Sequence, residues 1–124
     1  ADEGEAKFRE LEAIAIADAM KLADQVIALG GGAVLREENR KIIRESGHRV
    51  IYLRCEPQEL HRRINSDPAT AANRPNLTDL GGGIEEIRKV LAEREPIYRE
   101  MMHAELEVTN LEPANAMVYI VRLL

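Results

Sequence analysis

Two short runs of consecutive apolar residues constrain the fold of this 124-residue chain more than any other feature of its sequence. The runs are Val-Ile-Ala-Leu at 26–29 and Val-Ile-Tyr-Leu at 50–53. A continuous apolar run of this length is typical of a strand buried on both faces of a parallel sheet. Residues 3–22 have apolar positions at helical spacing, and residues 36–46 form a second helix that Gly47 ends. Strands that alternate with helices in this way predict an α/β domain with a parallel sheet.

The same alternation continues through the second half of the chain. Pro57 begins a helix that extends to about residue 65, because proline is tolerated in the first helical turn. A further helix over 84–103, a weaker third strand at 106–109 and a closing helix at 114–124 follow. The length of the chain fits one domain, although three strands make a thin core.

Residues 66–83 interrupt this alternation. They contain Pro68, Pro75 and a second run of three glycines, with few residues of the kind that fill a core. Connections of such length inside a compact domain are usually lids or binding loops. We therefore expect a mobile lid over about residues 66–83.

Composition excludes several classes of function. Aromatic residues make up 3% of the chain, too few for the stacking platforms that bind single-stranded nucleic acid. The single cysteine, Cys55, has no partner for an internal disulfide, and no cluster of cysteine and histidine has the spacing of a zinc site. No apolar run approaches the ~18 residues of a membrane helix. These features predict a cytoplasmic domain that binds no nucleic acid and no membrane and holds no metal through its own residues.

Basic residues are concentrated in the middle of an otherwise acidic chain. The formal net charge is −5, yet residues 36–74 contain 9 basic and 6 acidic side chains. This distribution fits a local site for an anion, such as a nucleotide or a small acid, better than a nucleic-acid surface. A solvated helix surface of mixed charge is the simpler interpretation for most of these residues.

Three consecutive glycines, Gly30, Gly31 and Gly32, follow the first apolar run. We call them the glycine loop. Ligands of open α/β sheets bind at the carboxyl ends of the strands, and glycines let the backbone approach a ligand closely. The loop matches neither GxGxxG nor GxxxxGKS/T, so it is not itself a phosphate-binding P-loop. A plain flexible turn is the alternative.

Arg94 falls on the apolar side of the helix over 84–103. The same side carries Ile84, Ile87, Leu91 and Tyr98. An arginine there needs a partner, because an unpaired buried charge is very costly. The partner is either an acidic neighbour in a structural ion pair or the carboxylate or phosphate of a substrate. Arg9, beside Phe8, which we expect to be buried, presents the same choice, with a surface helix arginine as the simpler interpretation.

Two further arginines are associated with the predicted lid. Arg74 lies within it and could close over a transferring phosphoryl group as arginine fingers do, although an ordinary loop arginine is the alternative. Arg63 precedes the lid and could flank a nucleotide.

Together, these motifs resemble the shikimate kinase family. In chain order they are GEAKFR at 4–9 with Glu12 after it, VIALGGG at 26–32, VIYL at 50–53, the Arg74-Pro75 pair, and REPIY at 94–98. The match covers essentially the whole chain in the order of the family, and it is the series rather than any one motif that is specific.

The resemblance implies a P-loop kinase-type fold, with three α/β/α layers, a parallel sheet and a mobile lid. It implies transfer of a phosphoryl group from ATP, with Mg²⁺, to the 3-hydroxyl of shikimate in aromatic amino-acid biosynthesis. By the same match, Arg9 and Arg94 hold the shikimate carboxylate, and Gly31 contacts shikimate through its backbone in a loop shaped by Gly30 and Gly32. Arg74 reaches the ATP phosphates as a catalytic residue, and Arg63 lies against the adenine.

The chain also departs from the family pattern. It lacks the family's P-loop and an early aspartate, which belong to an amino-terminal strand–P-loop–helix–strand unit. In the family, the strand of that unit lies between the strands that match 26–29 and 50–53. We therefore expect the main ATP and Mg²⁺ residues upstream, an inactive chain in isolation, and a monomer when the protein is intact. Smaller departures are Asn76 in place of leucine, a longer lid, and no arginine within 109–113.

Two alternatives are open at this point. One is a kinase of another small hydroxy acid, such as gluconate, on a related fold. The other is a non-catalytic, kinase-derived domain that binds shikimate.

Overall fold

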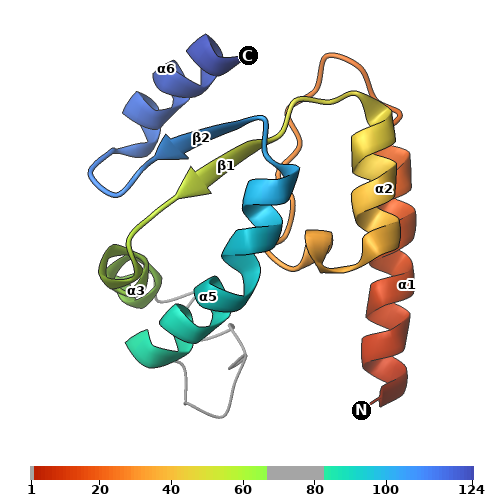
Figure 1. Ribbon diagram of the computed structural model, residues 1–124, viewed down its shortest axis with the longest axis horizontal. Helices are drawn as coiled ribbons and strands as arrows, with labels where there is room; N and C mark the ends of the chain where they lie inside the picture. Colours follow the sequence, from red (N-terminus) through yellow and green to blue (C-terminus); the bar gives the residue numbers. More distant parts are fainter. Residues whose placement is uncertain (1, 67–82) are drawn as a thin grey trace. The chain divides into compact units, whose positions relative to one another are not determined.

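A computed structural model describes residues 2–66 and 83–124 (Figure 1). The chain divides into two compact units, residues 1–49 and residues 50–124, which we call the N-terminal and C-terminal units. Most of the predicted lid, including Arg74, lies outside the described residues. The sequence-based expectation of a single domain stays a prediction.

The N-terminal unit contains the helices α1 (Asp2–Ala19) and α2 (Glu37–Ser46), with the short 3₁₀ helix η1 (Ala33–Leu35) between them. The helix predicted over 3–22 is confirmed, although it ends three residues earlier. α2 is confirmed as well, and Gly47 ends it with a left-handed φ of 77°, which glycine adopts without steric cost. α1 and α2 pack against each other, and Ile16 and Ile43 are buried.

The predicted strand at 26–29 is wrong. Residues 25–30 have no regular secondary structure, and Val26 is 91% exposed. A strand is stabilised by backbone hydrogen bonds to a neighbouring strand, and the described residues of the N-terminal unit contain no strand to supply them. The apolar run is therefore suited to a strand of a sheet, but the described residues of its own unit offer it no strand to pair with.

The C-terminal unit contains two strands and three helices. These are β1 (Ile51–Arg54), α3 (Pro57–Ser66), α5 (Ile84–Met101), β2 (Ala104–Glu107) and α6 (Pro113–Leu123). Each was predicted from the sequence, and the largest shift is that of β2, which begins two residues earlier than expected.

β1 and β2 form a parallel pair, which confirms the predicted parallel arrangement. Tyr52 is paired with Glu105 and Leu53 with Leu106. Two parallel strands need a crossover between them, and the segment that connects them contains α3 and α5. The ring of Tyr52 on β1 lies against that of Tyr98 on α5, with centroids 5.2 Å apart.

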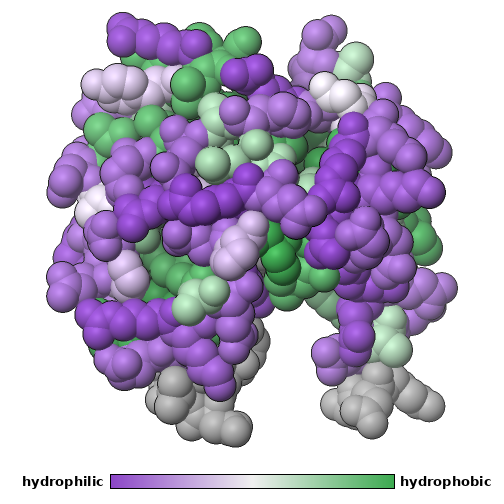
Figure 2. Space-filling model, viewed as in Figure 1, coloured by the Kyte–Doolittle hydropathy of each residue, from purple (hydrophilic) through white to green (hydrophobic). Residues whose placement is uncertain are grey.

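The described residues bury only a small apolar core. Cys55 is buried, as are Met101 and Val108. Figure 2 shows hydrophobic residues reaching the surface between polar side chains. Large exposed apolar side chains occur in both units, among them Phe8, Leu11, Ile14, Val26, Met117, Val121 and Leu124. Both units therefore leave apolar surface uncovered.

Candidate functional site

Two predicted substrate-binding elements lie close together in the N-terminal unit. A Cβ atom added at Gly30 would lie 4.0 Å from Oε2 of Glu12, which is three residues after Arg9 on α1. Arg36, which follows η1, donates a hydrogen bond from Nη1 to the backbone carbonyl of Arg9 at 3.2 Å. The structure therefore places the Arg9 region of α1 beside the glycine loop.

Arg9 is a surface residue in this unit. Its guanidinium pairs with Glu5 at 3.1 Å, and the two side chains are 50% and 68% exposed. The expectation that Phe8 is buried is wrong, because this residue is 63% exposed. An exposed ion pair contributes at most about 1 kcal/mol, so a ligand carboxylate could replace Glu5 at little cost.

The glycine loop leads directly into η1. The Ala33 N–H donates to the Gly30 carbonyl at 3.0 Å, and the Leu35 N–H donates to the Gly32 carbonyl at 3.2 Å. Ala33 is buried, so the end of the loop is anchored in the unit while the glycines stay near its surface.

Sequence reasoning missed two polar residues that contact this region. Asn39 and Arg40, on α2, donate hydrogen bonds to backbone carbonyls of η1. A signal was present for Asn39, because it precedes the buried Ile43 by four residues and so shares the apolar side of α2. A polar residue at such a position indicates a specific hydrogen-bond partner.

In the C-terminal unit, Arg94 is half-buried on α5. Within residues 2–66 and 83–124, no hydrogen bond or ion pair joins its guanidinium to another group. The structural ion pair considered from the sequence thus has no partner in the described residues. A half-buried guanidinium without a partner is suited to bind an external anion.

The residue next to Arg94 is held firmly. Glu95 accepts a hydrogen bond from the Tyr52 hydroxyl at 3.3 Å and pairs with Arg99 at 3.1 Å. Arg99 also pairs with Glu105 on β2 at 2.9 Å. Burial raises the pKa of Tyr52 to about 12, and the Glu95 carboxylate adds to this rise. The turn of α5 that carries Arg94 is therefore tied to both strands.

Arg63, the predicted adenine neighbour, anchors the loop before α6. Its Nη2 donates to the carbonyls of Val108, Thr109 and Leu111 at 2.9, 3.1 and 3.2 Å. Its Nε donates to Glu59 at 2.9 Å. These bonds use donors in the plane of the guanidinium, so none of them occupies its flat faces.

Glu59 is the acidic partner of two neighbouring arginines. Hydrogen bonds from Arg62, and then from Arg63, lower the pKa of Glu59 to about 2. Glu59 therefore stays ionised at physiological pH and holds Arg63 in place.

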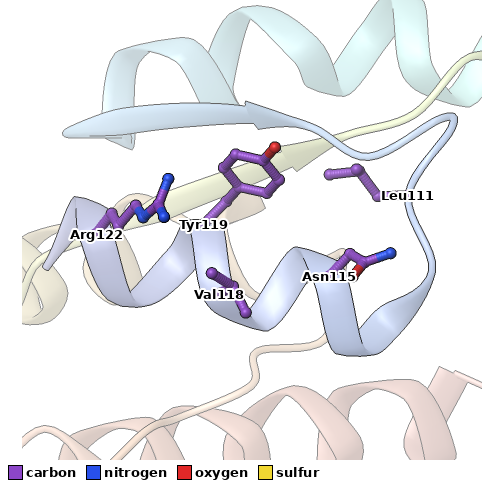
Figure 3. A pocket seen from close by; sticks show the side chains of 5 residues that line it. All are labelled: Leu111, Asn115, Val118, Tyr119 and Arg122. Carbon is purple, nitrogen blue, oxygen red and sulfur yellow. The ribbon is translucent and has the colours of Figure 1, made fainter.

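A pocket of about 230 Å³ lies along α6 (Figure 3). It is lined by Leu111, Asn115, Val118, Tyr119 and Arg122. The Arg122 guanidinium lies 5.8 Å from the centroid of the Tyr119 ring. None of the site residues predicted from the sequence lines this pocket. Leu111, whose carbonyl binds Arg63, connects the pocket to the loop that Arg63 anchors.

Two classes of feature are absent from the described parts of the chain. Residues 2–66 and 83–124 contain no group of three or more histidine, cysteine and acidic residues that could hold a metal ion. None of the helices described here combines the length and apolar character needed to cross a membrane.

Known proteins resemble this chain in sequence and in fold. The family model for shikimate kinase matches residues 1–124. The shikimate kinase of Rhodopirellula baltica is 43% identical over 99 residues, which cover 80% of this chain and 52% of that protein. The shikimate kinase of Nitrosococcus oceani is 40% identical over 114 residues, which cover 92% of this chain and 56% of that protein.

A solved structure, the shikimate kinase from Acinetobacter baumannii in complex with shikimate, is similar to this chain with a TM-score of 0.81 and 31% identity. The similarity covers 98% of this chain and 64% of that one, and it confirms the predicted α/β fold of P-loop kinase type. The chain spans about half the length of the curated relatives it matches. On its sequence and its fold, this chain belongs to the shikimate kinase family.

Proposed function

We propose that the protein containing this chain transfers a phosphoryl group from ATP to the 3-hydroxyl of shikimate, in the chorismate pathway of aromatic amino-acid biosynthesis. The observation that carries this proposal is the half-buried guanidinium of Arg94, which has no partner in the described residues. The names of the relatives support it, as does the solved relative that holds shikimate.

The substrate carboxylate is the anion assigned to Arg94 and Arg9. A guanidinium binds a carboxylate through two parallel hydrogen bonds, which orient the ligand as well as hold it. The turn of α5 that carries Arg94 is anchored through Glu95, and Arg9 gives up only an exposed pair with Glu5. The glycine loop, through Gly31 between Gly30 and Gly32, is assigned to the backbone contact with shikimate.

ATP is assigned to Arg63 and Arg74. The flat faces of the Arg63 guanidinium, which its in-plane hydrogen bonds do not use, suit stacking on the adenine, and the loop that Arg63 anchors would border the nucleotide. Arg74 is assigned to the ATP phosphates, where it would neutralise charge on the transferring group.

Mg²⁺ is expected with ATP, but no residue of this chain is proposed to hold it. The described residues contain no cluster of acidic side chains suited to a metal. The protein contributes mainly position and charge stabilisation, since phosphoryl transfer needs little covalent participation from side chains.

The test is product formation. The protein containing this chain is incubated with ATP, Mg²⁺ and a panel of hydroxy acids that includes shikimate and gluconate, and phosphorylated products are identified by mass spectrometry. We expect shikimate 3-phosphate alone. A phosphorylated gluconate product would instead indicate a kinase of another small hydroxy acid. Shikimate binding without any product would indicate a non-catalytic binding domain.

We infer that the same protein is a cytoplasmic monomer that acts on small molecules. Light scattering of the purified protein measures its molar mass in solution and so tests whether it is a monomer. The 124-residue chain alone is expected to show no turnover in the same assay.

A further inference from the structure

Two consecutive residues near the start of α2 hold three consecutive carbonyls of η1. Asn39 donates from Nδ2 to the Ala33 carbonyl at 2.9 Å. Arg40 donates from Nη1 to the carbonyls of Val34 and Leu35 at 2.7 and 2.9 Å. A three-residue helical turn leaves such carbonyls without partners of its own, so these side chains supply them.

Asn39 provides this hydrogen bond, but its buried amide also lowers the stability of the folded state. Its side chain is fully buried, with 0% exposure, and its Oδ1 has no hydrogen-bond partner in the described part of the chain. A buried acceptor without a partner destabilises the folded state. An apolar residue, such as Ile43 one turn later, would pack there without that cost. The hydrogen bond to Ala33 is the feature that an apolar residue could not provide.

Arg40 is held rigidly as well. Its side chain is 16% exposed, and its Nη2 lies 2.7 Å from Oε2 of Glu37. Its Nε also donates to Glu37, at 2.9 Å. The guanidinium is therefore fixed between an acidic side chain on one side and two backbone carbonyls on the other.

The held turn continues directly from the glycine loop. The Ala33 and Leu35 N–H groups donate to the carbonyls of Gly30 and Gly32, while the Ala33 and Leu35 carbonyls accept from α2. η1 therefore links the loop on one side to α2 on the other. Three successive glycines have wide conformational freedom, so a defined loop needs support from outside itself.

We propose that Asn39 and Arg40 are positioning residues that fix the glycine loop in the conformation that receives the substrate. The inference rests on the proposed function, because it assigns shikimate to that loop. Neither side chain is proposed to touch the substrate.

The experiment uses the protein containing this chain and three variants: Asn39→Leu, Arg40→Ala and Ile43→Val. Asn39→Leu removes the donor and also the unpaired Oδ1, and it keeps the number and branching of the side-chain heavy atoms. Arg40→Ala removes the second donor from a side chain that is not fully buried, and it keeps the proposal testable if Asn39→Leu does not fold. Ile43→Val is the matched control, since it loosens the core of the same helix without removing a hydrogen bond to η1.

We measure amide hydrogen exchange, thermal unfolding and shikimate kinetics. In Asn39→Leu and Arg40→Ala, we expect exchange at Ala33 and Leu35 to accelerate about tenfold, with the rest of the chain unchanged. The KM for shikimate should rise about tenfold, with the KM for ATP retained. Ile43→Val should lower the unfolding temperature without a selective effect at Ala33 and Leu35.

The proposal is overturned if both folded variants keep the parent exchange at Ala33 and Leu35, or if exchange rises uniformly as in Ile43→Val. Selective loosening with an unchanged shikimate KM would also overturn it, because the loop conformation would then not matter for the substrate. If the parent protein does not act on shikimate, the proposed function fails, while the exchange data still decide whether these residues hold the loop.

Discussion

The Tyr52 hydroxyl donates a hydrogen bond to Oε2 of Glu95 at 3.3 Å, which joins strand β1 to the turn of α5 that carries Arg94. Tyr52 and Glu95 are 43 residues apart in the sequence. The contact thus makes the position of a proposed substrate-binding residue depend on the packing of α5 against the sheet.

Tyr52→Phe should remove this hydrogen bond and keep the ring contact with Tyr98. We expect a loss of about 1 kcal/mol in the free energy of unfolding, measured by urea denaturation. The pKa of Tyr52 is raised to about 12 from 10.0, so its stabilising contribution is complete below pH 10 and is lost as the pH rises towards 12. Stability of the parent should therefore decline between these values, and more steeply than stability of Tyr52→Phe. Equal slopes would show that Tyr52 ionises like an exposed tyrosine.

Arg94→Ala should reduce kcat/KM for shikimate about 100-fold, because the substrate carboxylate loses a charge-assisted partner. The KM for ATP should change little. Arg88→Ala is the matched control on the same helix, since Arg88 is exposed and pairs only with Glu85 among the described residues. Normal shikimate kinetics in Arg94→Ala would contradict the assignment of this residue to the carboxylate.

Arg74→Ala should lower kcat more than it weakens shikimate affinity, since a contact with the transferring group strengthens in the transition state. Steady-state kinetics and direct titration with shikimate separate the two effects. Small and equal changes in both would make Arg74 an ordinary loop residue.

Arg63→Ala should free the loop before α6, because three backbone carbonyls lose their shared donor. We expect the free energy of unfolding to fall by about 1–3 kcal/mol and the KM for ATP to rise. Arg62→Ala is the matched control, because Arg62 binds Glu59 from an exposed position and reaches none of these carbonyls. Equal effects of the two substitutions would leave the anchoring by Arg63 without support.

The 124-residue chain made by itself should associate or unfold without a sharp transition. Large apolar side chains are exposed in both units, with Val26 at 91% and Val121 at 63%. Such surface favours association over a folded monomer. Light scattering combined with thermal unfolding checks this, and a monodisperse monomer with a cooperative transition would refute it.

Local sequence signals determined most of the secondary structure. Apolar spacing predicted α1, Gly47 predicted the end of α2, and Pro57 predicted the start of α3. Each of these signals affects only residues close to it in the sequence, through side-chain periodicity or backbone conformation, and needs no distant partner. The series of short motifs likewise indicated the family before any tertiary contact was known.

Only the tertiary structure decided which of these segments found partners. Among the described residues of its own unit, the apolar run at 26–29 finds no strand to pair with, whereas β1 pairs with β2. Arg63 binds carbonyls 45 to 48 residues away, and Arg94 has no partner in the described residues although acidic side chains flank it in the sequence. Hydrogen bonds depend on the distance and direction between donor and acceptor, and for groups far apart in the chain the fold alone sets both.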